Sequence, residues 1–278
     1  MYLLIITTIA IINVPNAQCL LLDILDGRVV GGEKARIAEF PHQISLRYNK
    51  KHTCGGSIID AYYILTAAHC VYGRNRPKKF TVVAGSSFLY KGGNHHEVES
   101  IVYPKRYTPR SLNHDVAVIK LKKAIVFGKY QQPIALTMRD TPKGLMAKFS
   151  GWGLMSYPNN TLPDNLQKVD VFTYSNSVCQ KLHNRNRNSF QQPSTIYPGM
   201  LCAFNMHSVG ACKGDSGGPL ILDTRRGPVQ IGVVSWVWRY CALGVPDVYA
   251  RVYYYLNWIN KQTNYTIFDR EEEYDLNY

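Results

Sequence analysis

The chain has 278 residues, of which 46% are hydrophobic and 18% are charged, and its formal net charge at pH 7 is +13. This composition is enough for one globular unit with a sizeable core, and it excludes a chain that is disordered throughout. The excess of Lys and Arg favours an anionic polymer as a partner, such as a polysaccharide, an acidic protein or nucleic acid, although a solvated basic surface is the simpler interpretation.

The first nineteen residues have the pattern of a signal peptide. Residues 2–12 are apolar apart from two threonines, which is too short a run to span a bilayer. Ala17-Gln18-Cys19 follows, with small residues at the two positions that a signal peptidase inspects. The segment lacks Lys and Arg, so a retained membrane anchor is the alternative. We expect residues 1–19 to be removed, the protein to be secreted into the extracellular space, and no membrane span to remain.

Short apolar runs separated by Gly, Pro and Asn make up most of the remaining chain. Their length and spacing are typical of β-strands in an all-β sandwich or barrel, and the absence of alternating strands and helices argues against a parallel α/β fold. Helical periodicity is found at 253–262 and in a shorter segment at 174–182. The predicted strands are 43–48, 57–59, 63–67, 80–84, 116–121, 167–173, 229–235 and 247–252.

Polar segments lie between and after these elements. The stretches 155–163 and 183–198 are rich in Asn, Pro, Ser and Arg and are expected to form loops. Asn159 and Asn264 each begin an Asn-X-Thr sequon and are candidate glycosylation sites. Residues 263–278 form an expected acidic tail of net charge −4, in which one Arg stands against Asp269, Glu271, Glu272, Glu273 and Asp275.

The sequence contains seven cysteines, an odd number that requires explanation in a secreted protein. Cys19 lies at the expected signal cut and can leave with the signal peptide. No Cys-X-X-Cys pair occurs, which argues against a zinc site and favours disulfides formed in an oxidising compartment. The six cysteines that would form three disulfides are Cys54, Cys70, Cys179, Cys202, Cys212 and Cys241.

The strongest chemical motif is Gly214-Asp215-Ser216-Gly217-Gly218-Pro219. A serine hydroxyl becomes a good nucleophile only when a base takes its proton, and flanking glycines allow a tight turn whose N–H groups point at a substrate. The motif also matches the nucleophile elbow of α/β-hydrolases, which place their histidine after the serine. That interpretation is excluded because the eight histidines, at 42, 52, 69, 95, 96, 114, 183 and 207, all precede Ser216.

His69 is the best candidate for the base. It follows the apolar run 64–68 and precedes Cys70, so we expect it at the end of a buried strand with its orientation fixed by a disulfide. His95 and His96 lie in a polar stretch that we expect to be a solvated loop. Asp115 begins an apolar run and is expected to be buried, where an unpaired carboxylate would be costly and an imidazole N–H would be a suitable partner.

These segments resemble the signature blocks of the trypsin/chymotrypsin family, in the family's order of His, Asp and Ser. The resemblance covers residues 29–262 and implies a chymotrypsin-like all-β fold, with two antiparallel six-stranded β-barrels, a C-terminal helix and an active site between the barrels. The matching blocks are Val29-Val30-Gly31-Gly32, Thr66-Ala67-Ala68-His69-Cys70, residues 115–121, Gly151-Trp152-Gly153 and residues 214–219.

The resemblance also implies a role for each residue of the site. Ser216 is the nucleophile of a serine endopeptidase, His69 is the general base and then the acid, and Asp115 holds the imidazole. The N–H groups of Gly214 and Ser216 form an oxyanion hole, and Ser235 supports the aspartate and the substrate backbone. The implied disulfides are Cys54–Cys70, Cys179–Cys202 and Cys212–Cys241.

Activation of an inactive precursor is implied in the same way. Residues 20–28 would be a propeptide, and a trypsin-like protease would cleave after Arg28 to begin the protease domain at 29–262. The freed amino group of Val29 would pair with Asp215 and order the oxyanion hole.

The substrate pocket departs from the family pattern. Trypsins carry an aspartate at the pocket base, where this chain has Gly210 followed by Ala211. Asp247 stands where glycine is common, and Val237, after Trp236, replaces a glycine and narrows the pocket. A preference for small aliphatic, basic or mixed side chains therefore remains open. Lys213 at the pocket mouth favours acidic residues elsewhere in the substrate.

We expect protein or peptide substrates, no cofactor, no specific nucleic-acid partner and a monomer. The loop 85–93 contains no carboxylate, so the calcium site found in many trypsins is not expected, nor is any other metal. The alternative to an active enzyme is a non-catalytic homologue that acts as a binding protein on the same fold.

Overall fold

The computed structural model describes residues 32–74, 76–154, 161–186, 195–205, 210–238, 241 and 244–263. Several sequence-based expectations concern residues outside this set and stay predictions. They are the signal peptide and propeptide, cleavage between Arg28 and Val29, glycosylation of Asn159 or Asn264, and the acidic tail beyond Thr263.

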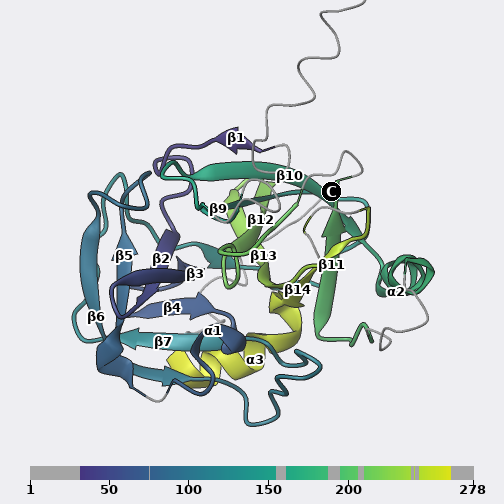
Figure 1. Cartoon of the computed structure of the whole chain (residues 1–278), viewed down its shortest axis with the longest axis horizontal. Helices are drawn as coiled ribbons and strands as arrows, with labels where there is room; N and C mark the ends of the chain where they lie inside the picture. The colour runs from purple at the N-terminus through teal and green to yellow at the C-terminus, as the bar shows by residue number, and fades with distance from the viewer. Residues whose placement is uncertain are drawn as a thin grey trace, which may run out of the picture.

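The first half of the described chain forms a closed antiparallel barrel (Figure 1). Its strands follow one another around the barrel in the order β2-β3-β4-β7-β6-β5. The interior is filled by side chains such as Ile44, Leu46 and Ile119, which have no exposed surface. The strands are β2 (Gln43–Tyr48), β3 (Lys51–Ile58), β4 (Tyr63–Thr66), β5 (Phe80–Ala84), β6 (Asn94–Val102) and β7 (Ala117–Leu121).

The second half forms another six-stranded antiparallel barrel. Its order is β9-β10-β11-β14-β13-β12, and it closes because β9 pairs with both β10 and β12. The short strands β1 (Glu33–Lys34) and β8 (Ala135–Leu136) add to β10 and β13 outside the ring. The barrel strands are β9 (Met146–Gly151), β10 (Gln167–Tyr174), β11 (Met200–Phe204), β12 (Pro219–Thr224), β13 (Gly227–Trp236) and β14 (Asp247–Arg251).

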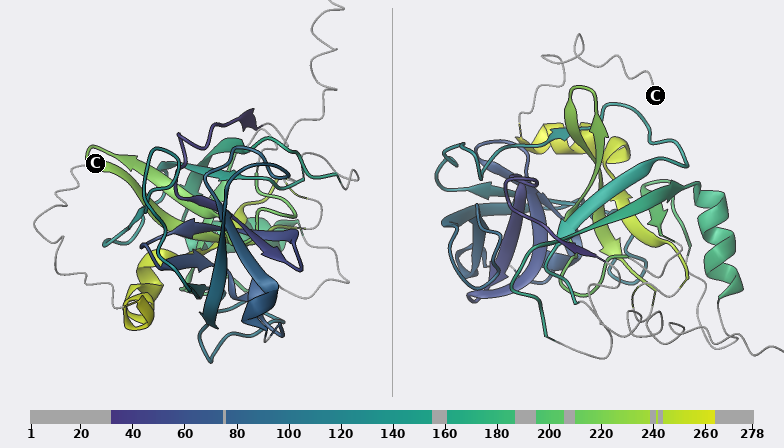
Figure 2. Two further views of the ribbon diagram at one scale, coloured as in Figure 1. Left: turned by 90° about the vertical axis from the view of Figure 1, so that its left-hand side faces the viewer. Right: turned by 90° about the horizontal axis from the view of Figure 1, so that it is seen from above.

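The two barrels lie side by side and are joined by buried hydrogen bonds as well as by apolar packing (Figures 1 and 2). Ser150 of β9 donates to Gln43 of β2 at 2.8 Å, and Ser57 of β3 donates to Gln230 of β13 at 2.6 Å. Each pair satisfies polar side chains that have almost no access to water, which fixes how the two barrels meet.

Among the described residues there are also four helical segments. In α3 (Val252–Thr263), Val252, Tyr255, Leu256 and Ile259 recur at helical spacing and are buried against β13 and β7, so this helix packs across both barrels. The helix α2 (Asn176–Arg185) lies at the outer edge of the second barrel (Figures 1 and 2) and is capped by Ser175. The other two segments are α1 (Ala68–Val71) and η2 (Pro77–Lys79).

The structure confirms the all-β class, the two barrels and the C-terminal helix. Three sequence-based assignments are wrong. His95 and His96 lie in β6, not in a loop, and His96 bonds to Gln131 at 3.2 Å. His183 belongs to the last turn of α2, not to a loop. His69 lies in α1, because the preceding strand β4 already ends at Thr66.

The longest helix among the described residues is α3, and neither it nor any other described helix has the length and apolar character of a membrane span.

Candidate functional site

The segment around Ser216 is held by both barrels. The carbonyl oxygen of Ser216 accepts a hydrogen bond from the N–H of Gly55 in β3 at 2.7 Å, and the N–H of Gly217 donates to Val234 in β13 at 2.7 Å. Gly217 has a φ of +81°, and a Cβ there would collide with Thr66 Oγ1. Only glycine satisfies both conditions, so the glycine that follows the serine is required by the contact between barrels.

His69 and Asp115 meet at the edge of the first barrel. The imidazole Nδ1 lies 2.7 Å from Asp115 Oδ2, and the backbone N–H of His69 donates to Asp115 Oδ1 at 2.8 Å. Asp115 is only 2% exposed, whereas a quarter of the His69 side chain is accessible. The Cys54–Cys70 disulfide beside the histidine fixes the position of α1. The sequence-based pairing of these two residues is thus found in the structure.

Ser235 completes the environment of the carboxylate. Its hydroxyl donates to Asp115 Oδ2 at 2.5 Å. The same carboxylate oxygen therefore receives hydrogen bonds from the serine hydroxyl and from the imidazole, while Oδ1 binds the His69 backbone. These three hydrogen bonds fix the carboxylate, and the contact at Nδ1 orients the imidazole so that Nε2 is the ring nitrogen not used by Asp115.

The side chains of Ser216 and His69 are not hydrogen-bonded to each other. No hydrogen bond joins Ser216 Oγ to the imidazole among the residues that the structure describes, and His69 Nε2 lies 3.7 Å from Cys70 Sγ. Such contacts are often long without substrate and tighten in the reacting complex. Both residues are nevertheless attached to β3, one through the Cys54–Cys70 disulfide and the other through Gly55.

Two backbone donors without a partner lie in the segment around Ser216. Within the described ranges, the N–H groups of Gly214 and Ser216 have no hydrogen-bond acceptor, whereas the N–H of Asp215 between them bonds to Cys212 at 3.0 Å. Gly214 has a φ of +103°, which favours glycine. A developing oxyanion is stabilised by unused N–H groups of this kind, one on the serine and one on the residue two positions before it.

Sequence reasoning missed the two residues that fix this peptide. Nε2 of His52 lies 3.0 Å from the carbonyl oxygen of Gly214, and Nδ1 lies 2.9 Å from Ser45 Oγ. Burial lowers the pKa of His52 to about 4, so the ring is neutral. A carbonyl only accepts, so Nε2 carries the hydrogen and Nδ1 accepts from Ser45. No local motif marks a contact between residues that are 162 positions apart in sequence.

Asp215 is buried behind the serine. Its Oδ1 accepts from the N–H of Gly153 at 2.7 Å and its Oδ2 from the N–H of Cys212 at 2.9 Å. Burial raises the pKa of Asp215 to about 6, although both hydrogen bonds oppose this shift. A Cβ at Gly151 or Gly153 would collide with this carboxylate. The Gly-Trp-Gly block thus makes room for Asp215.

The predicted pocket residues also come together. Asp247 is buried, and its Oδ2 accepts from the N–H of Ala211 at 2.7 Å. A Cβ at Gly210 would collide with the same oxygen. Burial raises the pKa of Asp247 well above its usual range, and the charge of Asp215 adds to the effect. The buried hydroxyl of Tyr249 has no partner among the described residues.

The remaining pocket residues lie around this core. Val237 is half-buried and packs on the cluster of Leu154, Cys212 and Cys241, while Lys213 is exposed. The ring of Trp236 lies 5.1 Å from that of His183, whose Nε2 bonds to the carbonyl of Pro246 at 2.9 Å. His183 therefore contacts two of the segments predicted to form the pocket, although the sequence placed it in a loop.

All three expected disulfides are present. They join Cys54 to Cys70, Cys179 to Cys202 and Cys212 to Cys241. The sulfurs of Cys54 and Cys70 lie near a ring nitrogen of His69, as in some metal sites. Both sulfurs are in a disulfide, however, so they offer no thiolate to a metal ion.

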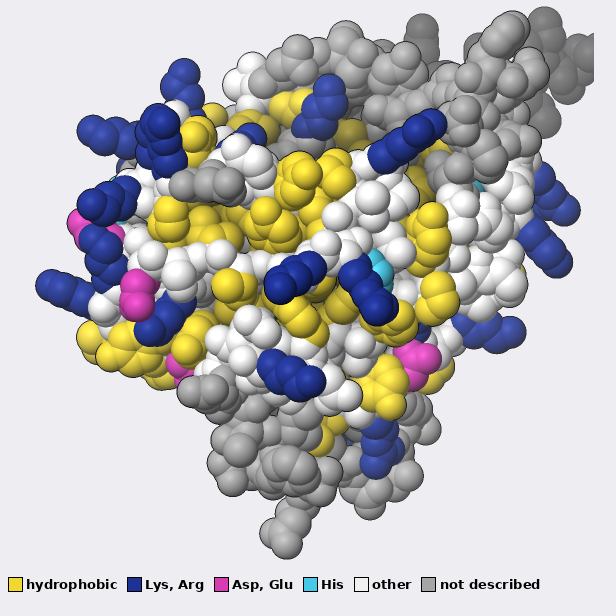
Figure 3. All heavy atoms as spheres, turned by 90° about the horizontal axis from the view of Figure 1, so that it is seen from below, with side chains coloured by type: hydrophobic (Ala, Val, Ile, Leu, Met, Phe, Trp, Pro, Cys, Tyr) yellow, Lys and Arg dark blue, Asp and Glu magenta, His cyan; other side chains and the backbone are white. Residues whose placement is uncertain are grey.

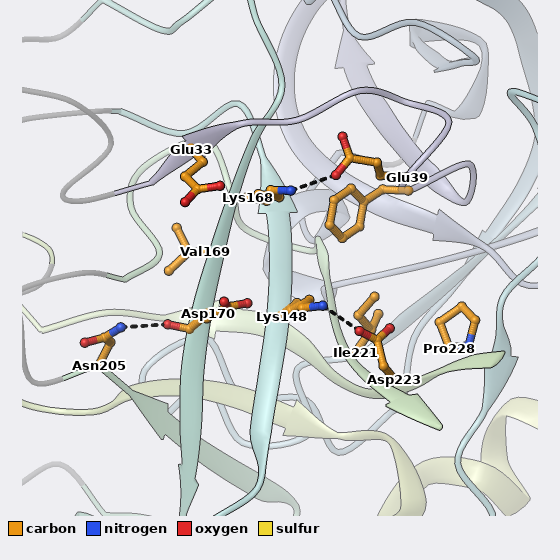
Figure 4. Close-up of a pocket in the computed structure, with 11 residues that line it drawn as sticks. Glu33, Glu39, Lys148, Lys168, Val169, Asp170, Asn205, Ile221, Asp223 and Pro228 are labelled. Carbon is orange, nitrogen blue, oxygen red and sulfur yellow. Dashed lines mark hydrogen bonds and ion pairs between the residues drawn. The ribbon is translucent and has the colours of Figure 1, made fainter. Parts of the chain in front are cut away.

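A separate hollow of about 570 Å³ lies on the outside of the second barrel (Figure 4). It is lined by charged side chains of β1, β9, β10 and β12, and neither Ser216 nor His69 reaches it. Lys168 bonds to Glu39 at 2.7 Å and Lys148 to Asp223 at 2.6 Å. These pairs already satisfy both lysines, so this hollow is not a candidate for the reaction site.

Comparison with known proteins agrees with this geometry. The family model described as Trypsin matches residues 29–259. The chain is 37% identical over 239 residues to trypsin delta of Drosophila melanogaster, covering 86% of this chain and 90% of that protein. It is 37% identical over 234 residues to chymotrypsin-2 of Vespa crabro, covering 84% and 99% respectively. The same family thus includes relatives named for trypsin and for chymotrypsin.

The site described above contains a serine with two flanking backbone donors and a histidine oriented by a buried aspartate. This arrangement, the two barrels and the family match over most of the chain lead to one conclusion. The chain belongs to the trypsin family and is a serine endopeptidase that acts on protein substrates.

Proposed function

We propose that this peptidase is secreted as an inactive precursor and, once cleaved after Arg28, hydrolyses peptide bonds with His69, Asp115 and Ser216. The observation that carries the proposal is the network in which Asp115 Oδ2 binds both His69 Nδ1 at 2.7 Å and the Ser235 hydroxyl at 2.5 Å. This network serves catalysis because it holds the imidazole in the form that accepts a proton at Nε2.

In the proposed first step, Ser216 Oγ attacks the carbonyl carbon of the scissile bond while its proton passes to His69 Nε2. The positive charge that forms on the imidazole is stabilised by the Asp115 carboxylate. His69 then gives that proton to the leaving nitrogen as the C–N bond breaks, which leaves an ester on Ser216. A water molecule, deprotonated by the same histidine, hydrolyses the ester and restores the serine.

The carbonyl oxygen becomes negatively charged during each attack. In our proposal it accepts hydrogen bonds from the N–H groups of Gly214 and Ser216. The loss of one such donor typically costs about 10²–10³ in rate. His52 is a positioning residue in this scheme, because its bond to the Gly214 carbonyl restrains the peptide that bears one donor.

Activation depends in this proposal on Asp215. The α-amino group of Val29, freed by a trypsin-like protease, enters the second barrel and pairs with this buried carboxylate. The support is that burial already raises the pKa of Asp215 to about 6, so a neighbouring ammonium would strongly favour the ionised form. An uncompensated buried charge is unfavourable, so the pairing couples cleavage to the conformation next to Ser216.

We propose a mixed preference for the substrate side chain that enters the pocket. Asp247 supplies a carboxylate where a basic side chain could reach it, and burial raises the pKa of that carboxylate. Val237 reduces the width of the pocket and favours small or unbranched side chains. Ala and Lys would then both be accepted, and the proportion of basic residues would depend on pH.

Reaction with a fluorophosphonate probe tests the catalytic proposal. The chain activated by cleavage after Arg28 should incorporate one probe at Ser216, and the Ser216→Ala variant should incorporate none. If the activated chain retains its fold by circular dichroism and is not labelled, it is a binding protein rather than an active peptidase.

A further inference from the structure

The first barrel carries a groove of about 600 Å³ that the catalytic proposal does not use. It lies between the segment after β1, the loop that joins β5 to β6 and the loop that precedes β8. We call it the basic groove and define it by Arg36, Ile37, Phe88, Lys91, Lys129 and Tyr130.

The loops around the basic groove are tied to one another. Ser87 Oγ accepts from the N–H of Ile37 at 2.9 Å, which joins the segment after β1 to the β5–β6 loop. Within that loop, the N–H of Phe88 donates to Ser86 Oγ at 2.9 Å. The loop is also attached to Asp164, whose carbonyl oxygen accepts from the N–H of Leu89 at 2.7 Å. The groove is therefore a preformed surface, and a ligand would not have to order these loops.

The charges of the groove are not neutralised. Arg36, Lys91 and Lys129 form no ion pair with any carboxylate among the described residues, although other surface lysines such as Lys120 and Lys168 do. Basic side chains outnumber acidic ones on the face seen in Figure 3 as well, so unpaired charge alone does not identify a site. The groove is distinctive because its charges stand beside exposed aromatic rings.

Those rings are Phe88 and Tyr130, which are 37% and 49% exposed. Lys91 Nζ lies 4.2 Å from the centroid of Phe88, and Lys129 Nζ lies 5.6 Å from that of Tyr130. Cation–π contacts hold both lysines next to the rings. A ligand that matches this surface carries several negative charges and also apolar or aromatic side chains, as an acidic peptide does.

The chain itself contains such a peptide. Residues 267–275 read Ile-Phe-Asp-Arg-Glu-Glu-Glu-Tyr-Asp, with five carboxylates against one guanidinium and an aromatic residue on each side of the glutamates. The helix α3 ends at Thr263 and packs on β7 of the same barrel that carries the groove. Glu271 follows Thr263 by eight residues. An extended chain of this length spans roughly 25 Å, so Glu271 can lie up to that distance from the end of the helix.

We propose that the acidic segment 267–275 of this chain occupies the basic groove. Its carboxylates neutralise Arg36, Lys91 and Lys129, and its aromatic side chains cover Phe88 and Tyr130. The groove is on a different part of the first barrel from His69, so this interaction does not depend on catalysis.

Zero-length carbodiimide cross-linking of the full chain at low salt, followed by peptide mass spectrometry, tests the proposal. The expected products join Lys91 or Lys129 to Glu271, Glu272 or Glu273. The pairs Lys168–Glu39 and Lys148–Asp223, at 2.7 and 2.6 Å, are internal positive controls. A mixture of isotope-labelled and unlabelled chains shows whether the segment comes from the same molecule, as proposed, or from a second copy, which would contradict the proposal of a contact within one chain.

Arg36→Gln is the decisive variant, because arginine is not cross-linked by this reagent. It should remove most of the product between the segment and the groove and leave the two control pairs unchanged. Arg226→Gln, in the exposed hairpin between β12 and β13, is the matched control and should have no effect. The proposal is overturned if the control pairs react while the acidic segment is joined to no lysine, or is joined equally to lysines over the whole surface.

Discussion

The carboxylate of Asp247 fills the space beside Gly210, where its Oδ2 accepts a hydrogen bond from the N–H of Ala211 at 2.7 Å. The two residues exclude each other's side chains, because a Cβ at Gly210 would collide with that oxygen. In our proposal Asp247 thus supplies a carboxylate to the base of the substrate pocket from β14, instead of from the segment that precedes the serine.

The first prediction concerns pH and substrate choice. Burial raises the pKa of Asp247, so its neutral form persists to higher pH than that of an ordinary aspartate. A Lys or Arg side chain in the pocket requires the ionised form. The ratio of kcat/KM for Lys substrates to that for Ala substrates should therefore rise with pH. Peptides that differ only at that position, assayed between pH 6 and 9, provide the measurement.

Asp247→Asn is the matched variant for this experiment. It should lower kcat/KM for Lys and Arg substrates by about 10- to 100-fold, the usual contribution of a charged hydrogen bond, and change Ala substrates little. The ratio should also lose its pH dependence. Equal losses for all substrates would mean that Asp247 only supports the fold.

A second prediction tests the exclusion between Gly210 and Asp247. Gly210→Ala should lower the free energy of unfolding by about 1–3 kcal/mol, because the new methyl group overlaps the carboxylate. In the Asp247→Gly background the same change should cost much less. Urea denaturation of the two single variants and the double variant measures the coupling, and additive effects would contradict the steric explanation.

A third prediction compares the loss of the Asp115 carboxylate with the loss of the Ser235 hydroxyl that binds to it. Asp115→Asn should lower kcat by about 10⁴, because the amide favours the wrong imidazole tautomer. Ser235→Ala removes only the hydroxyl that bonds to Oδ2 and should have a much smaller effect on kcat. Steady-state kinetics with one amide substrate compares them. Equal losses would show that Ser235 has more than a supporting role.

The fourth prediction concerns His52. Its pKa is lowered to about 4 by burial, whereas the unfolded chain has an ordinary histidine. Between these values the unfolded state binds more protons, so the stability contributed by neutral His52 is present above pH 6.5 and is lost as the pH falls toward 4. Each histidine of this kind adds a slope of about 1.4 kcal/mol per pH unit.

His52→Gln should therefore reduce the dependence of the unfolding free energy on pH in this range. Urea titrations at several pH values test this, with the exposed His95→Gln as the control. Other groups contribute as well: burial lowers the pKa of His42 to about 3 and raises that of Asp215 to about 6, which act in opposite directions. The comparison of variants cancels them, and identical slopes would contradict the assignment of a neutral, buried His52.

A fifth prediction concerns activation. Arg28→Gln should leave the protein nearly inactive after treatment with an activating protease, because the ammonium of Val29 would not be formed. Cleavage is followed by amino-terminal sequencing and activity by hydrolysis of a peptide substrate. Full activity of the uncut chain would show that Asp215 needs no such partner.

Much of this site could be predicted because its chemistry is concentrated in short motifs. The serine with its glycines can be recognised within six residues, and so can the histidine beside a cysteine. The strands 43–48 and 80–84 were predicted with the bounds that the structure gives, because apolar and polar residues alternate in the first and apolar residues dominate the second. The strand β6 was missed because only Val98 of its nine residues is buried, which leaves little apolar signal.

Other features depend on contacts between distant segments and leave no local pattern. The bond from His52 to Gly214 exists only because the β2–β3 hairpin of the first barrel reaches the serine loop of the second. The collision between Asp247 and a Cβ at Gly210 likewise cannot be recognised from a motif that considers each residue separately. In both cases the residues are present in the sequence, but their proximity in the folded chain cannot be predicted from it.

The hydrogen bonds on either side of Ser216 also determine how this segment responds to a force between the two barrels. Gly55 of the first barrel binds its carbonyl oxygen, and the next residue is bound to Val234 of the second. Ser216, the proposed nucleophile, thus lies in a segment that is hydrogen-bonded to both halves of the molecule. A force that pulls the barrels apart would strain the serine loop itself, so separation of the halves and loss of the nucleophile's position should occur as a single event.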